Sequence, residues 1–242
     1  MTQAQNRPTA GILFLIVGVV AITANDLMIK LLSGGYPLHE IVFFRSGIGI
    51  CASLMFVHFE GGLRILRTKT PALHLLRCCI IVISNMTYFA ALAALPLADA
   101  TALFFVAPLL ITLLSIPLLG EKVGPWRLGA VVAGFVGVLL MMLAWRGEEA
   151  PADVPFVVLT LPIIAALTYA LNQIMTRKLG VASKASAMSV YMQLTFIAVS
   201  LGFFFVAGDG RFAAGTSNES LVFLLRAWVM PEGNDRWVLA AL

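Results

Sequence analysis

Apolar blocks of about twenty residues constrain this chain more than any other feature, because that length of helix crosses the hydrocarbon core of a bilayer. The composition agrees: 60% of the residues are hydrophobic and 12% are charged, whereas soluble domains have about 45–50% apolar and about 25% charged residues. The sequence therefore predicts an all-α integral membrane protein. Seven spans are expected, at about residues 11–32, 38–57, 78–95, 98–120, 126–144, 155–178 and 185–207.

The charge and the cysteines point to the membrane rather than to other partners. In a membrane protein a net charge of +4 reports topology, so we expect no nucleic acid partner. Cys51, Cys78 and Cys79 lie in or beside apolar runs without a metal-type spacing, so we expect them to pack. The sequence predicts no metal, no cofactor and no catalytic residue, and it predicts a lipid bilayer as the surroundings.

The basic residues divide unequally between the two ends of the predicted spans. Ten of the sixteen fall on one side: Arg7, Arg64, Arg67, Lys69, Arg77, Lys122, Arg127, Arg177, Lys178 and Lys184. The other side has Arg146, Arg211, Arg226 and Arg236. Because cytoplasmic loops carry an excess of Lys and Arg, this bias predicts a cytoplasmic N-terminus.

Polar residues begin abruptly near the end of the first span. No ionisable residue occurs from residue 11 to residue 22, and then Asn25, Asp26 and Lys30 follow closely. A similar segment occurs later in the chain: residues 172–177 (Asn-Gln-Ile-Met-Thr-Arg) resemble residues 25–30 (Asn-Asp-Leu-Met-Ile-Lys). We interpret these as inverted copies of one helical unit around a central path, as in inverted-repeat transporters. Coincidence in a chain rich in Leu and Met is the alternative.

The predicted depths suggest two ion pairs between the first two spans. Asp26 and Arg45 each lie about 9–10 Å below one surface, whereas Lys30 and Glu40 lie about 3 Å below it. We therefore expect Asp26 to pair with Arg45, and Lys30 with Glu40. Such pairs would either lock the helices together or handle a solute or a proton. Lys30 and Glu40 could instead snorkel to the interface.

Polar stripes mark three further spans. Side chains at helical spacing recur on the third span (Ser84, Asn85, Tyr88), the sixth (Tyr169, Asn172, Gln173, Thr176) and the seventh (Ser189, Gln193, Ser200). One such residue usually just joins two helices, but three striped helices favour a lined cavity. The predicted substrate-binding or pore-lining residues are Asn25, Asp26, Arg45, Asn85, Tyr88, Tyr169, Asn172, Gln173, Thr176 and Gln193.

Small residues and prolines give more local expectations. Gly129, Ala133 and Gly137 recur every four residues, which lets helices approach closely; we expect packing within the bundle, with a homodimer face as the weaker alternative. Pro108 and Pro117 are expected to break the hydrogen bonding of the fourth span.

The segment after the seventh span is expected to contain a short surface helix. Residues 221–230 are mostly apolar but too few to span. Thr216 and Glu219 before them resemble a capping box, and Pro231 is expected to end the helix.

Several motifs resemble the EamA repeat of the drug/metabolite transporter superfamily. They lie at residues 85–92, 96–103, 107–109, 118–121 and 134–139. The most recognisable is the Pro-Leu…Glu end of the fourth span, followed by a Gly-rich fifth span. The resemblance covers about residues 11–142 well and residues 155–242 in outline. It implies two inverted five-helix repeats that move a small metabolite by alternating access in the bacterial inner membrane.

The same resemblance implies how the chain divides. Residues 11–144 would be a first EamA-type repeat of five transmembrane helices, and residues 145–154 a linker. Residues 155–242 would be part of a second repeat, with two complete helices, an outer amphipathic segment and the start of another helix. The implied function is that of a secondary transporter, and its implied partner is an amino-acid, vitamin or nucleoside-like solute.

Two other classes of function are weighed against transport. No GxxxxGK[ST] motif occurs, so coupling would come from an ion gradient or from exchange. A membrane enzyme is the main rival, but neither HExxH nor GxSxG occurs, so we expect no enzymatic activity. A structural or assembly subunit without transport activity is the remaining alternative, and the incomplete second repeat favours it.

We expect that residues 1–242 alone do not transport, because the resemblance implies ten helices and only seven complete spans can be drawn. Residues 236–242 would cover only about 10 Å of a roughly 30 Å core. The measurement is flux of labelled metabolites in vesicles that contain only this polypeptide, with empty vesicles as the control. Uptake or efflux above that background would contradict the expectation.

Overall fold

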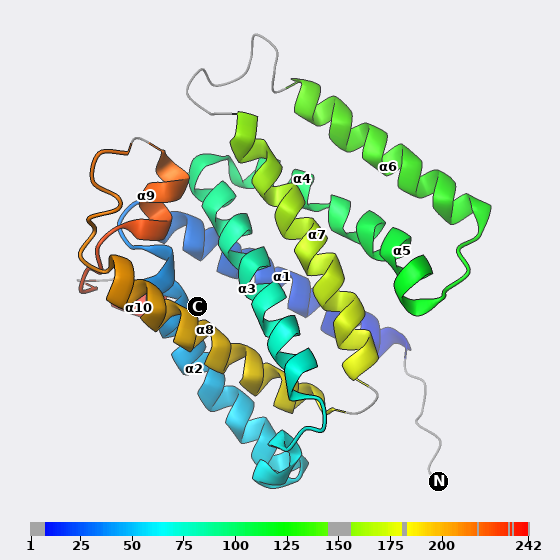
Figure 1. Ribbon diagram of the computed structural model, residues 1–242, viewed down its shortest axis with the longest axis horizontal. Helices are drawn as coiled ribbons and strands as arrows, with labels where there is room; N and C mark the ends of the chain where they lie inside the picture. The colour runs from blue at the N-terminus through cyan, green and yellow to red at the C-terminus, as the bar shows by residue number, and fades with distance from the viewer. Residues whose placement is uncertain are drawn as a thin grey trace.

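The helices account for nearly all of the described chain, which in the computed structural model comprises residues 8–144, 156–180, 183–216, 218–231, 233 and 235–241. In order they are α1 (Pro8–Leu32), α2 (Leu38–Glu60), η1 (Gly62–Leu66), α3 (Pro71–Ala94), α4 (Leu97–Phe104), α5 (Val106–Leu119), α6 (Pro125–Ala144), α7 (Phe156–Leu179), α8 (Ala185–Ala207), α9 (Glu219–Leu225) and α10 (Asp235–Ala241). No strand occurs within those described ranges. The predicted all-α fold is confirmed (Figure 1).

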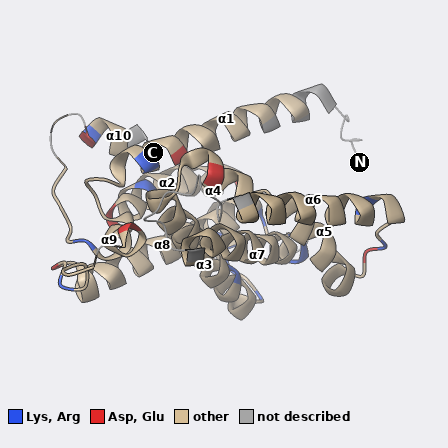
Figure 2. Ribbon diagram, turned by 90° about the horizontal axis from the view of Figure 1, so that it is seen from above, with Lys and Arg blue, Asp and Glu red and all other residues tan. Residues whose placement is uncertain are grey.

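The predicted number of membrane spans is also confirmed for the described residues. Seven helical segments there are long and apolar enough to cross a membrane, with α4 and α5 together forming the fourth. Most of the ribbon carries no charge (Figure 2). The predicted linker, residues 145–154, lies outside the described residues, and the division into two repeats stays a prediction.

The third span begins earlier than predicted. Helix α3 starts at Pro71 rather than near residue 78, with proline in its first turn, where the missing backbone N–H is not needed. His74 and Arg77 therefore belong to the helix and not to the preceding loop. Both side chains are buried and hydrogen-bond to α7, α8 or the segment between them. These partners within the protein allow two polar residues to lie in the helix.

The fourth span is interrupted once, just before Pro108, and not at Pro117. Helix α4 ends at Phe104 and α5 begins at Val106, with Phe105 between them. Pro108 has no N–H to donate to the carbonyl four residues earlier, that of Phe104, so the helical ladder is broken there. Pro117 lies inside α5 without ending it.

Two long helix pairs build the centre of the bundle. Helix α3 packs along α7, and α2 packs along α8 (Figure 1). Between α3 and α7, Ser84 Oγ donates to the carbonyl of Ala165 at 2.8 Å, and Ala165 is fully buried. Small side chains allow the two backbones to approach closely enough for that bond. The pairing places one face of α3 against α7 along most of its length.

Helices α1 and α6 lie at the margins. Large apolar side chains such as Phe14 on α1 and Val132 on α6 are exposed, as expected for helices that face lipid. The predicted packing of Gly129, Ala133 and Gly137 within the bundle is wrong: all three are exposed, and a Cβ at Gly129 or Gly137 would meet open space. Helix α6 packs through Gly134 instead, where a Cβ would meet the Leu109 side chain of α5.

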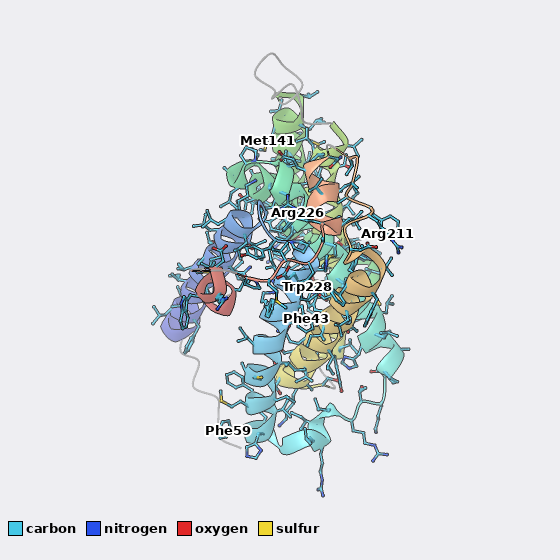
Figure 3. The ribbon with its side chains drawn as sticks, turned by 90° about the vertical axis from the view of Figure 1, so that its left-hand side faces the viewer. Phe43, Phe59, Met141, Arg211, Arg226 and Trp228 are labelled. Atoms are coloured by element: carbon cyan, nitrogen blue, oxygen red, sulfur yellow. The ribbon has the colours of Figure 1, made fainter. Side chains whose placement is uncertain are left out.

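The short helix after α8 forms where it was predicted but is capped differently. Asn218, and not Thr216, caps α9: its Oδ1 accepts from the Leu221 N–H at 3.3 Å. The helix ends at Leu225 rather than continuing to Pro231. Residues 226–230, the strap, then run back across the end of α2 (Figure 3). Trp228 packs edge-on against Phe43 with ring centroids 5.5 Å apart.

Replacing Ala165 by Leu is expected to lower stability by about 1–3 kcal/mol, because the larger side chain overpacks the contact between α3 and α7. The measurement is the thermal midpoint of the purified chain in detergent. The matched control is Ala130→Leu on the exposed face of α6, which is expected to leave the midpoint unchanged. Equal midpoints for the two variants would contradict the close packing of α3 on α7.

Candidate functional site

The Asp26 carboxylate joins α1 to α3. It is partly buried, and its Oδ2 accepts from Tyr88 Oη at 3.2 Å while its Oδ1 accepts from the neighbouring Asn25 Nδ2 at 3.3 Å. A charged group at membrane depth normally faces a partner or a wet cavity. Here the partners are a phenol and an amide, so the negative charge keeps hydrogen-bonding capacity for a further group.

The Arg45 guanidinium lies between α2, α3 and α8. It donates to Asn85 Oδ1 at 3.4 Å, and its Cζ is 5.8 Å from the ring centroid of Phe89 and 5.6 Å from that of Phe196. Aromatic faces attract a cation when water is excluded. Asn85 in turn donates to the Ile81 carbonyl at 3.2 Å, which fixes the amide that faces Arg45.

Asp26 and Arg45 do not form the direct ion pair that was predicted. The salt bridges within the described ranges are Arg177–Glu121 and Arg211–Asp209. Instead, α3 holds both charges: Tyr88 binds Asp26 and Asn85 binds Arg45. These two α3 residues are three positions apart, so they are neighbours on the helix surface. Depth predicted from the sequence does not reveal which side chains of a third helix bind each of the two charges.

The predicted pair of Lys30 and Glu40 is wrong. The Lys30 ammonium donates to the carbonyls of Leu92, Ala93 and Leu95, at 2.6, 3.1 and 3.0 Å. These carbonyls end α3, where they have no partner within the helix. A cation also complements the negative end of the helix dipole. Glu40 Oε2 accepts instead from the Val229 N–H at 3.0 Å, so it binds the strap.

The polar residues of α7 divide between two sets of contacts, one that includes Tyr169 and Gln173 and one that includes Asn172 and Thr176. Tyr169 Oη accepts from Gln173 Nε2 at 2.6 Å. The Tyr169 ring packs against Phe104 at 5.4 Å between centroids, and Phe104 packs against Tyr88 at 4.9 Å. An aromatic row therefore links the Asp26 site, through α4, to α7. We call Asn25, Asp26, Arg45, Asn85, Tyr88, Tyr169 and Gln173 the Asp26 group.

The other half of the stripe contacts Arg77, which the sequence analysis did not select. Arg77 Nη1 donates to Asn172 Oδ1 and Thr176 Oγ1, both at 3.4 Å. Its Nη2 donates to the Met188 carbonyl of α8 at 3.0 Å. A signal existed in the sequence: Arg77 is eleven residues before Tyr88, and eleven residues return nearly to the same helix face. Arg77 was missed because the third span was started too late.

Gln193 contacts neither the Asp26 group nor Arg77 in the described structure. Its side-chain amide lies against Gly49 of α2, and one turn earlier Ser189 Oγ is 2.8 Å from Ser53 Oγ. These contacts join α8 to α2, which is the ordinary role of polar side chains between membrane helices.

A cavity of about 460 Å³ lies beside α2, and none of its lining residues belongs to the Asp26 group or contacts Arg77. It is lined by Phe44, Ile48, Met230, Pro231, Arg236 and Leu239, none of which was among the predicted site residues. Across the part of the chain that the structure describes, no three His, Cys, Asp or Glu side chains gather where they could hold a metal ion.

Comparison with known proteins gives one family and several bacterial relatives. The EamA-like transporter family matches residues 9–143. The riboflavin transporter of Rhizobium johnstonii is 27% identical over 91% of this chain and 70% of its own length. The S-adenosylmethionine uptake transporter of Rickettsia felis is 26% identical over 95% and 79%. The pseudopaline exporter of Pseudomonas aeruginosa is 32% identical over 52% and 44%. No solved structure gives a significant match.

Changing Lys30 to Met is expected to destabilise the fold by about 1.5–3 kcal/mol, because three carbonyls at the end of α3 lose a charged donor. The measurement is the free energy of unfolding in detergent, with Lys69→Met at an exposed position as the control.

A double-mutant cycle separates this cap from the ion pair predicted earlier. Combining Lys30→Met with Glu40→Gln is expected to give additive losses within about 0.5 kcal/mol, as for residues without a shared contact. A larger coupling would show that Lys30 and Glu40 do act as a pair.

Proposed function

Since the chain belongs to the EamA-like transporter family, we propose that it is a secondary transporter of a small organic metabolite that works by alternating access. The seven apolar helices and the bacterial transporter relatives make it a multi-pass protein of the bacterial inner membrane. The names of the relatives point to transport and not to enzymatic activity.

The observation that carries the proposal is the Asp26 group. Its members come from α1, α2, α3 and α7, and they include both an acid and a base at membrane depth. Placing either ion there costs roughly 2.5–3.5 kcal/mol on insertion scales. Among the described residues the two ions form no salt bridge with each other, and their side-chain hydrogen bonds go to neutral groups. A polar solute that binds both would explain why they are kept.

The aromatic row supports a solute with a planar ring. Tyr88, Phe104 and Tyr169 form a row of rings that meet at steep angles, and the Tyr88 hydroxyl at one end of the row donates to the Asp26 carboxylate. Ligand sites commonly combine aromatic walls with a few polar groups that fix orientation. A vitamin or nucleoside-like solute fits this combination, and riboflavin and S-adenosylmethionine, named for two relatives, are the first solutes to test. An amino acid is the other member of the proposed class.

The membrane orientation and the repeats belong to the same proposal. We place the N-terminus in the cytoplasm, because nine of the sixteen basic residues lie in three segments on that side, residues 64–77, 122–127 and 177–184. In that orientation α1 and α7 enter the membrane from opposite sides, as the first helices of two inverted repeats would. Solute would then pass between the pairs α3–α7 and α2–α8.

The Asp26→Asn variant is expected to weaken solute binding about tenfold or more, because a hydrogen bond to an ionised group is worth roughly 1.5–3 kcal/mol. The measurement is equilibrium binding of labelled riboflavin, S-adenosylmethionine, amino acids and nucleosides to the full chain in lipid nanodiscs. Asp209→Asn is the matched control, since Asp209 is exposed beyond the end of α8.

The Tyr88→Phe variant sharpens this test. It keeps the ring of the aromatic row but removes the hydroxyl that donates to Asp26, so a smaller loss than that of Asp26→Asn is expected. Binding of none of the solutes by the natural chain, or equal binding by the natural chain and Asp26→Asn, would contradict the proposed site. Uptake by cells that express the gene tests the transport step itself.

A further inference from the structure

Arg77 is a buried cation in the inner half of the helix bundle. Its side chain comes from α3, it is 5% exposed, and it lies near the end of the bundle where α7 meets α8. Among the described residues its guanidinium donates three hydrogen bonds, to Asn172, Thr176 and the Met188 carbonyl, at 3.4, 3.4 and 3.0 Å. Two of the three are long for hydrogen bonds between N–H and oxygen. The guanidinium is therefore only loosely satisfied.

Arg77 has no carboxylate partner in the described part of the chain. The two salt bridges found there involve Arg177 and Arg211, both of which are exposed. The Arg77 Nε atom is buried and has no hydrogen-bond partner among the described residues. Removing an ion from water costs several kcal/mol unless another charge or a full set of hydrogen bonds replaces the water. One donor of this cation is thus left for a group that the described part of the chain does not supply.

His74 leaves a second buried nitrogen beside it. His74 is 3% exposed and is three residues before Arg77, so the two are neighbours on the surface of α3. Its Nε2 is 3.0 Å from Ser183 Oγ, and Tyr191 packs on its ring with centroids 4.9 Å apart. His74 Nδ1 is buried without a partner among the described residues. When Ser183 donates to Nε2, Nδ1 carries the hydrogen and becomes a donor.

Arg45 gives the comparison that makes Arg77 distinctive. Arg45 lies against two phenylalanine rings, and α3 holds Asp26 close to it. Among the described residues, Arg77 has amide, hydroxyl and carbonyl partners. Arg77 is therefore a buried positive charge with neutral hydrogen-bond partners, and α3 adds two buried nitrogens without a partner there, Arg77 Nε and His74 Nδ1.

We propose that Arg77 and His74 form a binding site for the anionic group, a carboxylate or a phosphate, of the transported solute; this rests on the proposed transport function. Arg77 supplies a guanidinium whose planar donors match a carboxylate or a phosphate, and His74 supplies the second donor. Asn172 and Thr176 hold Arg77 while no anion is bound. The anion would compete with these two α7 side chains, so its binding would loosen α3 from α7.

The experiment measures anion binding apart from transport. The full chain, purified in a maltoside detergent, is titrated with acetate, benzoate and inorganic phosphate at constant ionic strength, and its thermal midpoint is recorded. Acetamide and benzamide serve as neutral counterparts. We expect the natural chain to be stabilised by at least one anion and by neither amide.

The variants test which residues bind the anion. Arg77→Gln is expected to raise the half-saturating anion concentration about tenfold or more, because a charge-assisted hydrogen bond is lost. His74→Ala is expected to raise it by a smaller factor. Arg67→Gln, on an exposed loop before α3, is the matched control and should bind as the natural chain does. If Arg77→Gln fails to fold, Arg77→Lys, which keeps the charge but has no Nε donor, should still show weakened binding.

Several outcomes would overturn the proposal. These are the absence of any anion-dependent shift, an equal shift in the natural chain and the folded Arg77 variant, or an equal loss in Arg67→Gln. A shift caused by added phosphatidylglycerol but by none of the soluble anions would assign the site to a lipid headgroup instead of a solute. Anion binding without binding of any test solute would count against the proposed function alone. Solute binding and uptake that survive Arg77→Gln unchanged would count against the anion site alone.

Discussion

The absence of water from the bilayer core is the constraint on which this structure depends, since every buried polar group must find its partner within the protein. The end of α3 shows how this works. Its last carbonyls have no partner within the helix, and Pro96 prevents the helix from continuing. Lys30 of α1 supplies the missing donors through a single ammonium. The first helix is thereby attached to the bundle at the end where its buried residues lie, while its other half faces outward.

Among the described residues, the side chains of three charged residues within the spans hydrogen-bond to neutral groups and form no salt bridge with one another. Asp26 binds Tyr88 and Asn25, Arg45 binds Asn85, and Arg77 binds Asn172 and Thr176. A neutral partner satisfies some of the hydrogen-bonding capacity of an ion without cancelling its charge. Such a charge stays able to bind an ion or a polar solute. A bundle that only needed to be stable would gain more from apolar side chains of similar volume.

Helix α3 organises both polar groups because one of its faces meets α7 along most of its length. Arg77, Ser84 and Tyr88 recur on that face, and they bind Asn172, the Ala165 carbonyl and Asp26 in turn. A movement of α3 relative to α7 would therefore alter the contacts of Arg77, and it would also reach Tyr88 of the Asp26 group through Phe104 and Tyr169. This coupling would give the proposed alternating access a physical basis, since in that mechanism one helix set moves against the other around a fixed site.

Local physical chemistry made much of this structure readable from the sequence alone. The seven spans, the break near Pro108, the short helix before the strap and the polar faces of α3 and α7 follow from hydropathy, backbone donors and helical periodicity, which need only nearby residues. The partner of each polar side chain does not. Lys30 binds carbonyls more than sixty residues away, and Arg77 binds α7 and α8. Depth in the membrane limits the candidates, but only the packing of three or more helices decides which of them meet, because a carbonyl or an amide can satisfy an ion that the sequence would pair with an opposite charge.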